Sequence, residues 1–220
     1  MKDNSYIAGN KIPAQAKHKE KTEYNDFKIK YYMDRCKDKK VLDIGCVQHN
    51  QDNWKSKFWL HKAIKEVASE IQGIDIFQEG INNLKERGYT VTCADAQDFD
   101  LEEKFDVIVA GDIIEHLDNV GGFVSSCKRH MHKDSHLLIS TPNIFSARKL
   151  FKFLTSKNGE INVNPEHVHW YCPTTIRQLM QRHDLKLSSI TYGSRTFDRY
   201  IPLPKKIRHS TCFYDIEFFE

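Results

Sequence analysis

Short apolar runs alternate with amphipathic segments through the first two thirds of the chain, and this alternation restricts the possible folds most strongly. Residues 54–71, 79–88 and 120–131 repeat apolar side chains at helical spacing. The apolar runs that flank them are residues 39–46, 72–77, 89–95, 104–112 and 135–143. Strands that alternate with helices predict βαβ units, and hence a mainly parallel sheet covered by helices on both faces.

The two ends of the chain extend this pattern. Residues 1–23 are polar and lysine-rich and predict an arm, whereas residues 23–37 have the apolar spacing of a helix. We therefore divide the chain into an N-terminal arm and helix, residues 1–37, and a single domain, residues 38–220. In the tail, a helix is expected to begin near Pro173, because proline suits the first helical turn, and residues 213–220 predict a last strand.

Charge and cysteine usage narrow the class of protein. The net charge of +3 is too small to indicate a nucleic-acid partner. No apolar run approaches the roughly 20 residues that span a bilayer, and the N-terminus has no apolar signal region. The six cysteines stand singly without a CxxC pair, so we expect reduced thiols and a cytoplasmic location.

The residues at the strand ends are the candidates for ligand binding, because parallel sheets bind ligands at the carboxyl ends of their strands. Asp75 ends the second run, and its carboxylate can accept hydrogen bonds from two neighbouring hydroxyl groups. Asp95 can accept from an exocyclic amine of adenine, while the N–H of Ala96 can donate to a ring nitrogen. A solvated loop acid at Asp75 and a turn acid at Asp95 are the structural alternatives.

The loop after the first run argues against a dinucleotide. Gly45 allows a ligand to approach the backbone closely. A diphosphate, however, needs several glycine amides at a helix start, and the chain has Val47, Gln48 and His49 there. The sequence therefore favours a ribose and an adenine over a nicotinamide dinucleotide, although an oxidoreductase on a similar sheet stays an alternative.

The motifs together resemble a known family. "VLDIGC", "GIDI", "CADAQDFDL", "FDVIVAGDIIEHLDN" and "HLLISTPN" occur in the order and approximate spacing of class I S-adenosylmethionine-dependent methyltransferases. They look most like the branch that includes the ubiquinone O-methyltransferase-like enzymes, over roughly residues 38–145. "HVHWYCPTTIRQLMQRHDL" is similar to the segment after the fifth strand in that branch. The resemblance implies a Rossmann-like, doubly wound, mostly parallel seven-stranded sheet and S-adenosylmethionine as cofactor.

The resemblance also implies roles for single residues. Asp75, followed by Ile76, would hold the ribose hydroxyls, and Asp95 with Ala96 would hold the adenine. The remaining positions are Asp43, which matches the acid of the first motif, and Gly45, Gly111 and Asp112, which would face the methionine moiety. The family usually continues "DIGC" with two further glycines, so we expect a remodelled loop here, with a short helix around Trp54–Trp59.

The candidates for catalysis follow the fourth apolar run and the fifth. Glu115, His116 and His169 are the residues that we expect to assist methyl transfer, because histidine is a suitable base near neutral pH. His167 and His169 are two positions apart, so only one of them should face the site. Structural hydrogen bonds at a helix start, and packing beside Trp170, are the alternative explanations for these side chains.

A divalent metal site is a further hypothesis. Asp112, Glu115 and His116 stand at i, i+3 and i+4, and His167 or His169 could complete a set of oxygen and nitrogen ligands. The pattern is similar to the metal site of the small-RNA 3′-terminal ribose methyltransferases. Those enzymes favour glutamate where this chain has Asp112.

The acceptor is the least determined part of the prediction. Residues 144–157 interleave aromatic and aliphatic side chains with basic ones, which suits a membrane surface, an anionic acceptor, or a packed helix with a solvated basic face. We expect O-methylation of a small molecule, a glycan or a lipid-linked acceptor. A metal-assisted RNA ribose methyltransferase and a non-catalytic protein on a degenerate methyltransferase fold are the alternatives.

Overall fold

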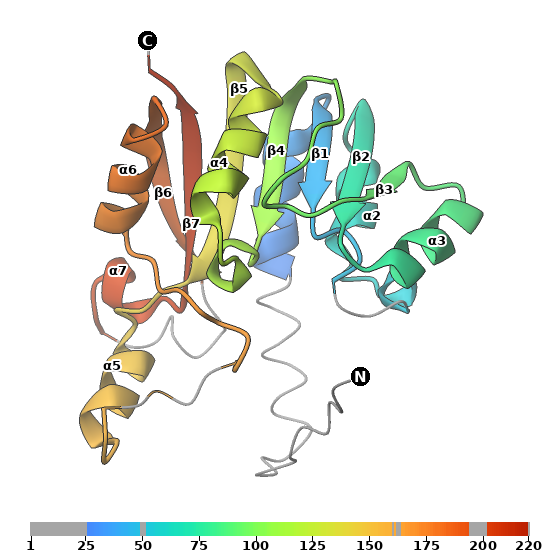
Figure 1. Ribbon diagram of the computed structural model, residues 1–220. Coiled ribbons are helices and arrows are strands. Elements are labelled where there is room, and N and C mark those ends of the chain that lie inside the picture. The colour runs from blue at the N-terminus through green and yellow to red at the C-terminus, as the bar shows by residue number, and fades with distance from the viewer. Residues whose placement is uncertain (1–25, 49–51, 160, 162–163, 194–201, 220) are drawn as a thin grey trace.

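A seven-stranded sheet forms the centre of the molecule (Figure 1), as seen in the computed structural model, which describes residues 26–48, 52–159, 161, 164–193 and 202–219. The strand order is β3-β2-β1-β4-β5-β7-β6. The strands are β1 (Lys40–Ile44), β2 (Glu70–Asp75), β3 (Val91–Cys93), β4 (Phe105–Gly111), β5 (Met131–Pro142), β6 (Leu185–Gly193) and β7 (Thr211–Phe218).

The sheet is mostly parallel, as predicted. Strands β1 to β5 pair in parallel, whereas β7 pairs antiparallel with both β5 and β6. The order reverses between β1 and β4, which lie side by side although β2 and β3 separate them in the chain. Open α/β sheets bind their ligands at such a reversal, beyond the carboxyl ends of the strands.

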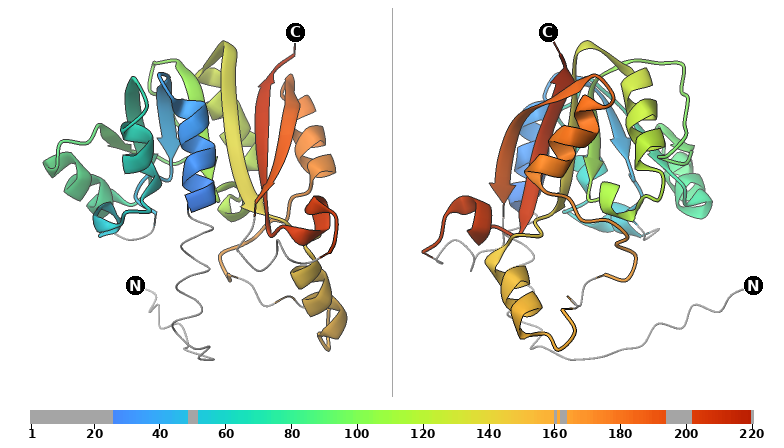
Figure 2. Two further views of the ribbon diagram at one scale, coloured as in Figure 1. Left: turned by 180° about the vertical axis from the view of Figure 1, so that it is seen from behind. Right: turned by 60° about the vertical axis from the view of Figure 1, so that its left-hand side comes forward.

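Helices cover both faces of the sheet, which confirms the doubly wound fold (Figure 2). On one face, α4 (Val120–Arg129) and α6 (Pro173–Gln181) pack through residues such as Phe123 and Ile176. On the other face, α2 (Leu60–Lys65) and a helix over residues 26–36 contribute Leu60 and Tyr32 to a second core. The other elements are η1 (Asn53–Lys55), α3 (Gln78–Glu86), η2 (Ile114–His116), α5 (Ala147–Thr155) and α7 (Lys205–Arg208).

The N-terminal helix packs into the core of the protein. Tyr31 and Tyr32 are buried, and their rings lie 4.5 and 6.0 Å from the ring of Phe213 on β7, measured between centroids. The predicted helix over 23–37 is thus present over 26–36, and the arm over residues 1–23 lies outside the described residues. The boundary at residue 37 remains our proposal.

The predicted helix over residues 54–71 is wrong in extent. The segment is divided into η1, an extended turn at Trp59, the short helix α2, and the start of β2 at Glu70. Trp59 is buried, and its indole N–H donates to the carbonyl of Cys46 at 2.7 Å, which holds this turn against the end of β1. Tertiary packing of a large aromatic side chain has therefore replaced the longer helix that periodicity predicted.

The other expected elements are present with shifted ends. The helix α3 ends before Gly88, which has the left-handed φ of +78° expected of a residue that stops a helix. The helix α6 begins at Pro173, and β7 begins two residues before the predicted strand. Along the described residues, no helix has the length and apolar character needed to cross a membrane.

Candidate functional site

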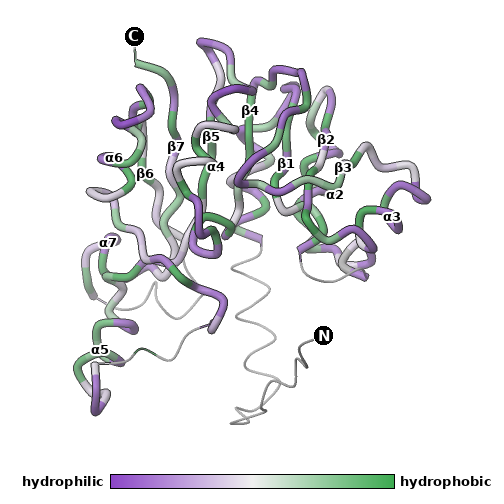
Figure 3. The backbone as a smooth tube through the Cα atoms, viewed as in Figure 1, coloured by the Kyte–Doolittle hydropathy of each residue, from purple (hydrophilic) through white to green (hydrophobic). Residues whose placement is uncertain are grey.

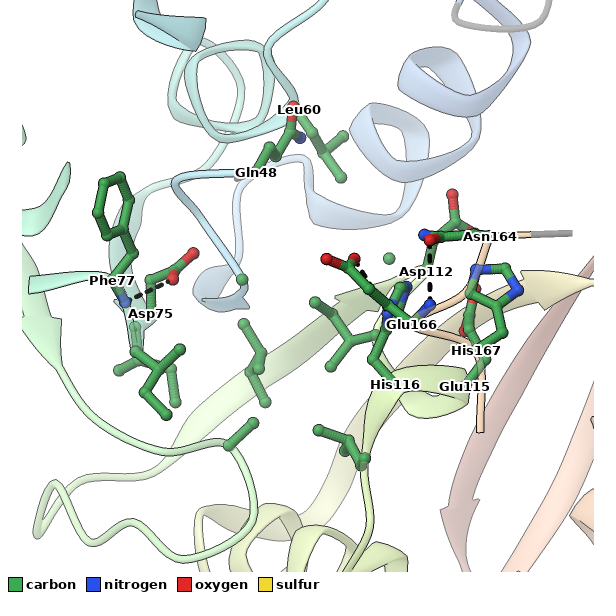
Figure 4. A pocket seen from close by; sticks show the side chains of 18 of the residues that line it. Gln48, Leu60, Asp75, Phe77, Asp112, Glu115, His116, Asn164, Glu166 and His167 are labelled. Atoms are coloured by element: carbon green, nitrogen blue, oxygen red, sulfur yellow. Dashed lines mark hydrogen bonds and ion pairs between the residues drawn. The ribbon is translucent and has the colours of Figure 1, made fainter. Parts of the chain in front are cut away.

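A cleft of about 1410 Å³ opens at the carboxyl ends of β1, β2 and β4 (Figure 4). Its wall includes most of the predicted cofactor residues, namely Gly45, Asp75, Ile76, Asp95, Ala96, Gly111 and Asp112. Ligand sites usually enclose about 300–1,000 Å³. The cleft therefore has room for a nucleoside-sized cofactor together with a second molecule.

Asp75 stands at the end of β2 with its carboxylate held in place by two backbone amides. Its Oδ2 accepts from the N–H of Val47 at 2.9 Å, and its Oδ1 accepts from the N–H of Phe77 at 3.0 Å. Each carboxylate oxygen can accept a second hydrogen bond. Asp75 is therefore oriented in advance and keeps capacity for a pair of hydroxyl groups.

Asp95 lies beyond β3 in a tight turn. Its Oδ1 accepts from the N–H of Gln97 at 2.9 Å, and the side-chain amide of Gln97 donates to the same carboxylate. Gln97 in turn accepts from the N–H of Asn119 at 2.6 Å, so the turn is tied to the start of α4. Asp95, Ala96 and Gln97 all line the cleft.

Gly45 lies on the wall of the cleft, but the group close to its backbone is the side chain of Ile113, and the approach of a ligand stays a prediction. The φ of Gly45 is +79°, and an added Cβ would collide with the Cδ1 atom of Ile113. The N–H groups of Gly45 and Cys46 both donate to the carbonyl of Ile74, at 2.8 and 3.2 Å. The turn after β1 is therefore kept tight by backbone bonds to β2, without the two further glycines.

The residues that replace those glycines have different positions. Val47 is buried in a small core with Trp59 and Ile81, while its N–H orients Asp75. Gln48 has a φ of +58° and lines the cleft. His49 lies outside the described residues, as does part of the expected remodelled loop.

Asp43 does not lie on the wall of the cleft. It is buried, and its Oδ2 lies 2.9 Å from Nδ1 of His61 on α2. The sequence placed this acid with the cofactor residues, whereas the structure places it behind them, between β1 and α2.

Lys28 is a wall residue that the sequence analysis missed. Its Nζ lies 2.7 Å from Oδ2 of Asp112, and the Oδ1 atom of Asp112 accepts from Ser140 at 2.8 Å. Burial alone would raise the pKa of Asp112, but the ammonium of Lys28 and these hydrogen bonds hold it below its ordinary value. Lys28 belongs to the helix over 26–36, and its i, i+2 neighbour Lys30 is exposed, so composition alone could not single it out.

Glu115, His116 and His167 meet at one end of the cleft (Figure 4). The rings of His116 and His167 lie 4.7 Å apart at 90°. Glu115 is only 1% exposed, and its carboxylate oxygens have no close hydrogen-bond partner among the described residues, although the hydroxyl of Thr141 is near enough to lower its pKa in part. Burial, and then the charge of Asp112, raises the pKa of Glu115 to about 8.

His169 is separated from this group. His167 lines the cleft and His169 does not, as their alternation along the chain predicted. The backbone N–H groups of Val168 and His169 donate to the carbonyl of Glu115 at 2.9 and 3.2 Å. These two hydrogen bonds attach residues 167–169 to η2 and direct His167 toward His116.

The predicted metal ligands are brought together in part. One ligand atom each from Glu115, His116 and His167 lies within 4.8 Å of the others, which is compatible with a divalent ion between them. Asp112 is instead engaged with Lys28 and Ser140. The three residues could hold a metal with an open position, or they could act as proton-transfer groups.

Three features together define a class I methyltransferase fold. They are the strand order, the cleft over β1 and β4, and the position of Asp75 and Asp95 at and beyond the ends of β2 and β3. A family model described as a methyltransferase domain matches residues 17–190. The chain belongs to this methyltransferase domain family.

A curated relative and two solved structures illustrate the similarity. The ubiquinone biosynthesis O-methyltransferase of Haemophilus ducreyi is 26% identical over 157 residues, which cover 61% of this chain and 63% of the relative. The chain spans between 40 and 63% of the length of the curated relatives it matches.

The two solved structures share the fold at low sequence identity. A SAM-dependent methyltransferase from Archaeoglobus fulgidus has a TM-score of 0.61 and 18% identity, covering 91% of this chain and 94% of its own. The N-methyltransferase NodS from Bradyrhizobium japonicum WM9, solved with S-adenosyl-L-homocysteine, has a TM-score of 0.57 and 13% identity, covering 90% and 87%.

Proposed function

We propose that this protein is an S-adenosylmethionine-dependent methyltransferase. The observation that carries the proposal is the position of Asp75 and Asp95 on the wall of one cleft, each oriented by backbone amides. One acid suits the two hydroxyls of a ribose and the other suits the amine of an adenine. The sequence after β1 lacks the further glycines that a diphosphate cradle needs, which disfavours a dinucleotide.

The rest of the cleft suits the amino-acid part of the cofactor. Gly45 and Gly111 both line the cleft, and the ammonium of Lys28 lies beside Gly111. A methionine moiety carries a carboxylate, so we assign that carboxylate to Lys28. Asp112 is a second carboxylate partner of the same ammonium, with its Oδ2 at 2.7 Å from Nζ.

The bound cofactor supplies an activated methyl group on a sulfonium. The protein must then hold the acceptor in line, exclude water and, for a hydroxyl acceptor, take its proton. We assign the proton acceptor to His116 or His167, which line the cleft beside the buried Glu115. Burial, together with the neighbouring His116 and Lys149, lowers the pKa of His167, which favours the neutral ring that a base requires.

For the acceptor, we infer an oxygen atom on a small molecule, a glycan or a lipid-linked intermediate. The curated relatives are named O-methyltransferases, whereas NodS is named an N-methyltransferase, so the fold alone does not select the atom. We infer a cytoplasmic location, because the six cysteines stand singly without a CxxC pair, as in proteins that keep reduced thiols.

Titration calorimetry with S-adenosylhomocysteine tests the cofactor assignment. Asp75→Ala and Asp95→Ala should each weaken binding by about 1–3 kcal/mol, the usual loss when a polar group loses its partner. Asp118→Ala, an exposed acid outside the cleft, is the matched control. Binding of NADH instead, or equal affinity in all variants, would refute the assignment, and no binding at all would favour the non-catalytic alternative.

The cluster of Glu115, His116 and His167 supports a second candidate, a metal-assisted transfer to a ribose hydroxyl of RNA. In that case methyl transfer from radiolabelled cofactor would stop in a chelator and return with Mg²⁺ or Mn²⁺. A metal-independent enzyme would keep its rate in the chelator. His167→Ala would impair transfer in both cases, so the chelator experiment separates them.

A further inference from the structure

The helix α5 has an apolar stripe that the fold does not cover. Ala147, Leu150, Phe151 and Leu154 stand at i, i+3, i+4 and i+7, the spacing that normally faces a protein core. No residue of α5 is buried, and Phe151 and Leu154 are 68% and 79% exposed. Phe145 and Phe153 are also exposed beside this stripe.

The orientation of α5 is set by its opposite face. Lys149 follows Ala147 by two residues, so it lies on the other side of the helix. Its Nζ is buried and lies 4.0 Å from the centre of the Trp170 ring, near the end of the cleft where His167 lies. This contact attaches α5 to the body of the protein and leaves the apolar stripe facing away from it.

Basic side chains border the stripe on one side of α5 and continue on α7. Arg148, Lys152 and Lys157 are exposed on or after α5, and Lys205 and Lys206 are exposed on α7. The side-chain amide of Asn143 donates to the carbonyls of Lys206 and His209, at 2.9 and 2.7 Å, which joins α7 to the start of this segment. Residues 143–158 and 202–209 contain no Asp or Glu.

The two helices project from the carboxyl end of the sheet, the same end that carries the cleft (Figures 1 and 3). An apolar stripe with a basic border is the pattern of a helix that lies in a membrane interface. Anionic lipid head groups would complement the basic residues, while the acyl chains would cover Phe151 and Leu154. A second copy of the chain would present the same positive charge and be repelled.

We propose that this surface, α5 together with α7, docks the protein on an anionic lipid bilayer. The proposal rests on the proposed function in one respect, since a docked enzyme would receive a lipid-linked acceptor with its cleft near the bilayer. The docking itself depends only on the helices and requires neither cofactor nor acceptor.

Vesicle co-sedimentation of the full chain tests the docking surface. The protein should bind vesicles made of equal parts phosphatidylcholine and phosphatidylglycerol, fail to bind pure phosphatidylcholine, and dissociate at high salt. Phe151→Ser with Leu154→Ser, and separately Lys205→Gln with Lys206→Gln, should each weaken vesicle binding at least about tenfold.

The control variants remove the same kinds of side chain, aromatic and lysine, at positions outside α5 and α7. Phe219→Ser removes another exposed aromatic, and Lys37→Gln with Lys133→Gln removes two exposed lysines away from α5 and α7. Both controls should bind vesicles like the parent. Binding that is unchanged in the α5 and α7 variants, or no binding to anionic vesicles, would overturn the proposal.

Two further outcomes would also overturn it. Tight binding of single-stranded RNA without vesicle binding would assign the surface to nucleic acid, and a dimer that the Phe151→Ser, Leu154→Ser variant abolishes would assign it to a second copy. Calorimetry with S-adenosylhomocysteine in the absence of lipid tests the cofactor assignment by itself. Failure of vesicle binding can therefore be distinguished from failure of the cofactor assignment.

Discussion

Lys28 brings a positive charge from the N-terminal helix to the wall of the cleft, beside Gly111 and Asp112. If it holds the carboxylate of the cofactor, Lys28→Met should weaken binding of S-adenosylhomocysteine about tenfold to a hundredfold, the range of a hydrogen bond to a charged group. Binding of 5′-methylthioadenosine should not change, because that compound lacks the amino-acid part. Calorimetry with both ligands measures the difference.

The control for this prediction is Lys30→Met, which removes an exposed lysine from the same helix. An equal loss for both ligands in Lys28→Met would show that Lys28 maintains the shape of the cleft. Unchanged affinity for both would show that it does not contact the cofactor.

Substitutions at Gly45 and Gly88 separate two costs of an added side chain, namely backbone strain and steric collision. Both have left-handed φ angles, +79° and +78°, but a Cβ at Gly45 would collide with Ile113 whereas one at Gly88 would meet no atom within 4 Å. Gly88→Ala should reduce the free energy of unfolding by about 1–2 kcal/mol, the strain of a left-handed alanine. Gly45→Ala should lose more, and urea unfolding would show this. Equal losses would mean that Ile113 moves aside freely.

Some site residues could be predicted from position alone and others could not. Gly45, Asp75 and Asp95 could be placed at the edge that carries the cleft, because parallel strands bring their carboxyl ends to one edge. Lys28 and Glu166 also line the cleft, but they arrive there through tertiary packing of segments that carry no strand-end signal. For Asp43 the family motif placed the acid correctly in the chain, yet its side chain turns to His61.

At the scale of elements, the connection between β1 and β2 was the hardest to predict. Apolar residues at helical spacing suggested one long helix, but Trp59 packs under the end of β1 and divides the segment. By contrast, strands β1 to β5 were predictable, because each contains a short apolar run bounded by polar residues. Their ends shifted by a few residues, since the pairing partner rather than the local sequence sets where a strand stops.

The pairing of β5 with β7 includes a pH-sensitive contact. Nδ1 of His136 lies 2.7 Å from Oδ1 of Asp215, and this hydrogen bond raises the pKa of His136 above its ordinary value. The charges of Asp215 and Glu217 act in the same direction, while burial and Lys39 oppose them. The contact should therefore stabilise the fold fully below the unfolded pKa, about 6.5, and lose this effect as the pH rises through the folded pKa.

His136→Gln should accordingly destabilise the protein more in mildly acidic buffer than in alkaline buffer. Chemical unfolding across this pH range measures the effect, and Asp215→Asn should remove the same pH dependence. If the free energy of unfolding of each variant differs from that of the parent by the same amount at every pH, the His136–Asp215 pair does not contribute to the pH dependence of stability.

For the molecule as a whole, the two faces of the sheet are covered by helices from different parts of the chain. The helix over residues 26–36 closes one face, and Tyr32 in it is fully buried against Phe213. Although we propose a domain boundary at residue 37, this packing predicts that helix and sheet unfold together. Tyr32→Ala should then lower the free energy of unfolding by about 3–5 kcal/mol.

Two probes would check this cooperativity. Circular dichroism follows the helices, and fluorescence of Trp54, Trp59 and Trp170 follows the packing around these side chains. The transitions should coincide in the parent and in Tyr32→Ala, with Lys30→Ala as the exposed control. Separate midpoints would show that the N-terminal helix is an independent unit.

The most direct test of the account is a crystal structure of the protein with S-adenosylhomocysteine. We predict the ribose hydroxyls within hydrogen-bond distance of the Asp75 carboxylate, the adenine amine against Asp95, and the ligand carboxylate on Lys28. A structure in which the ligand is absent from the cleft, or in which both aspartates turn away from it, would contradict the account.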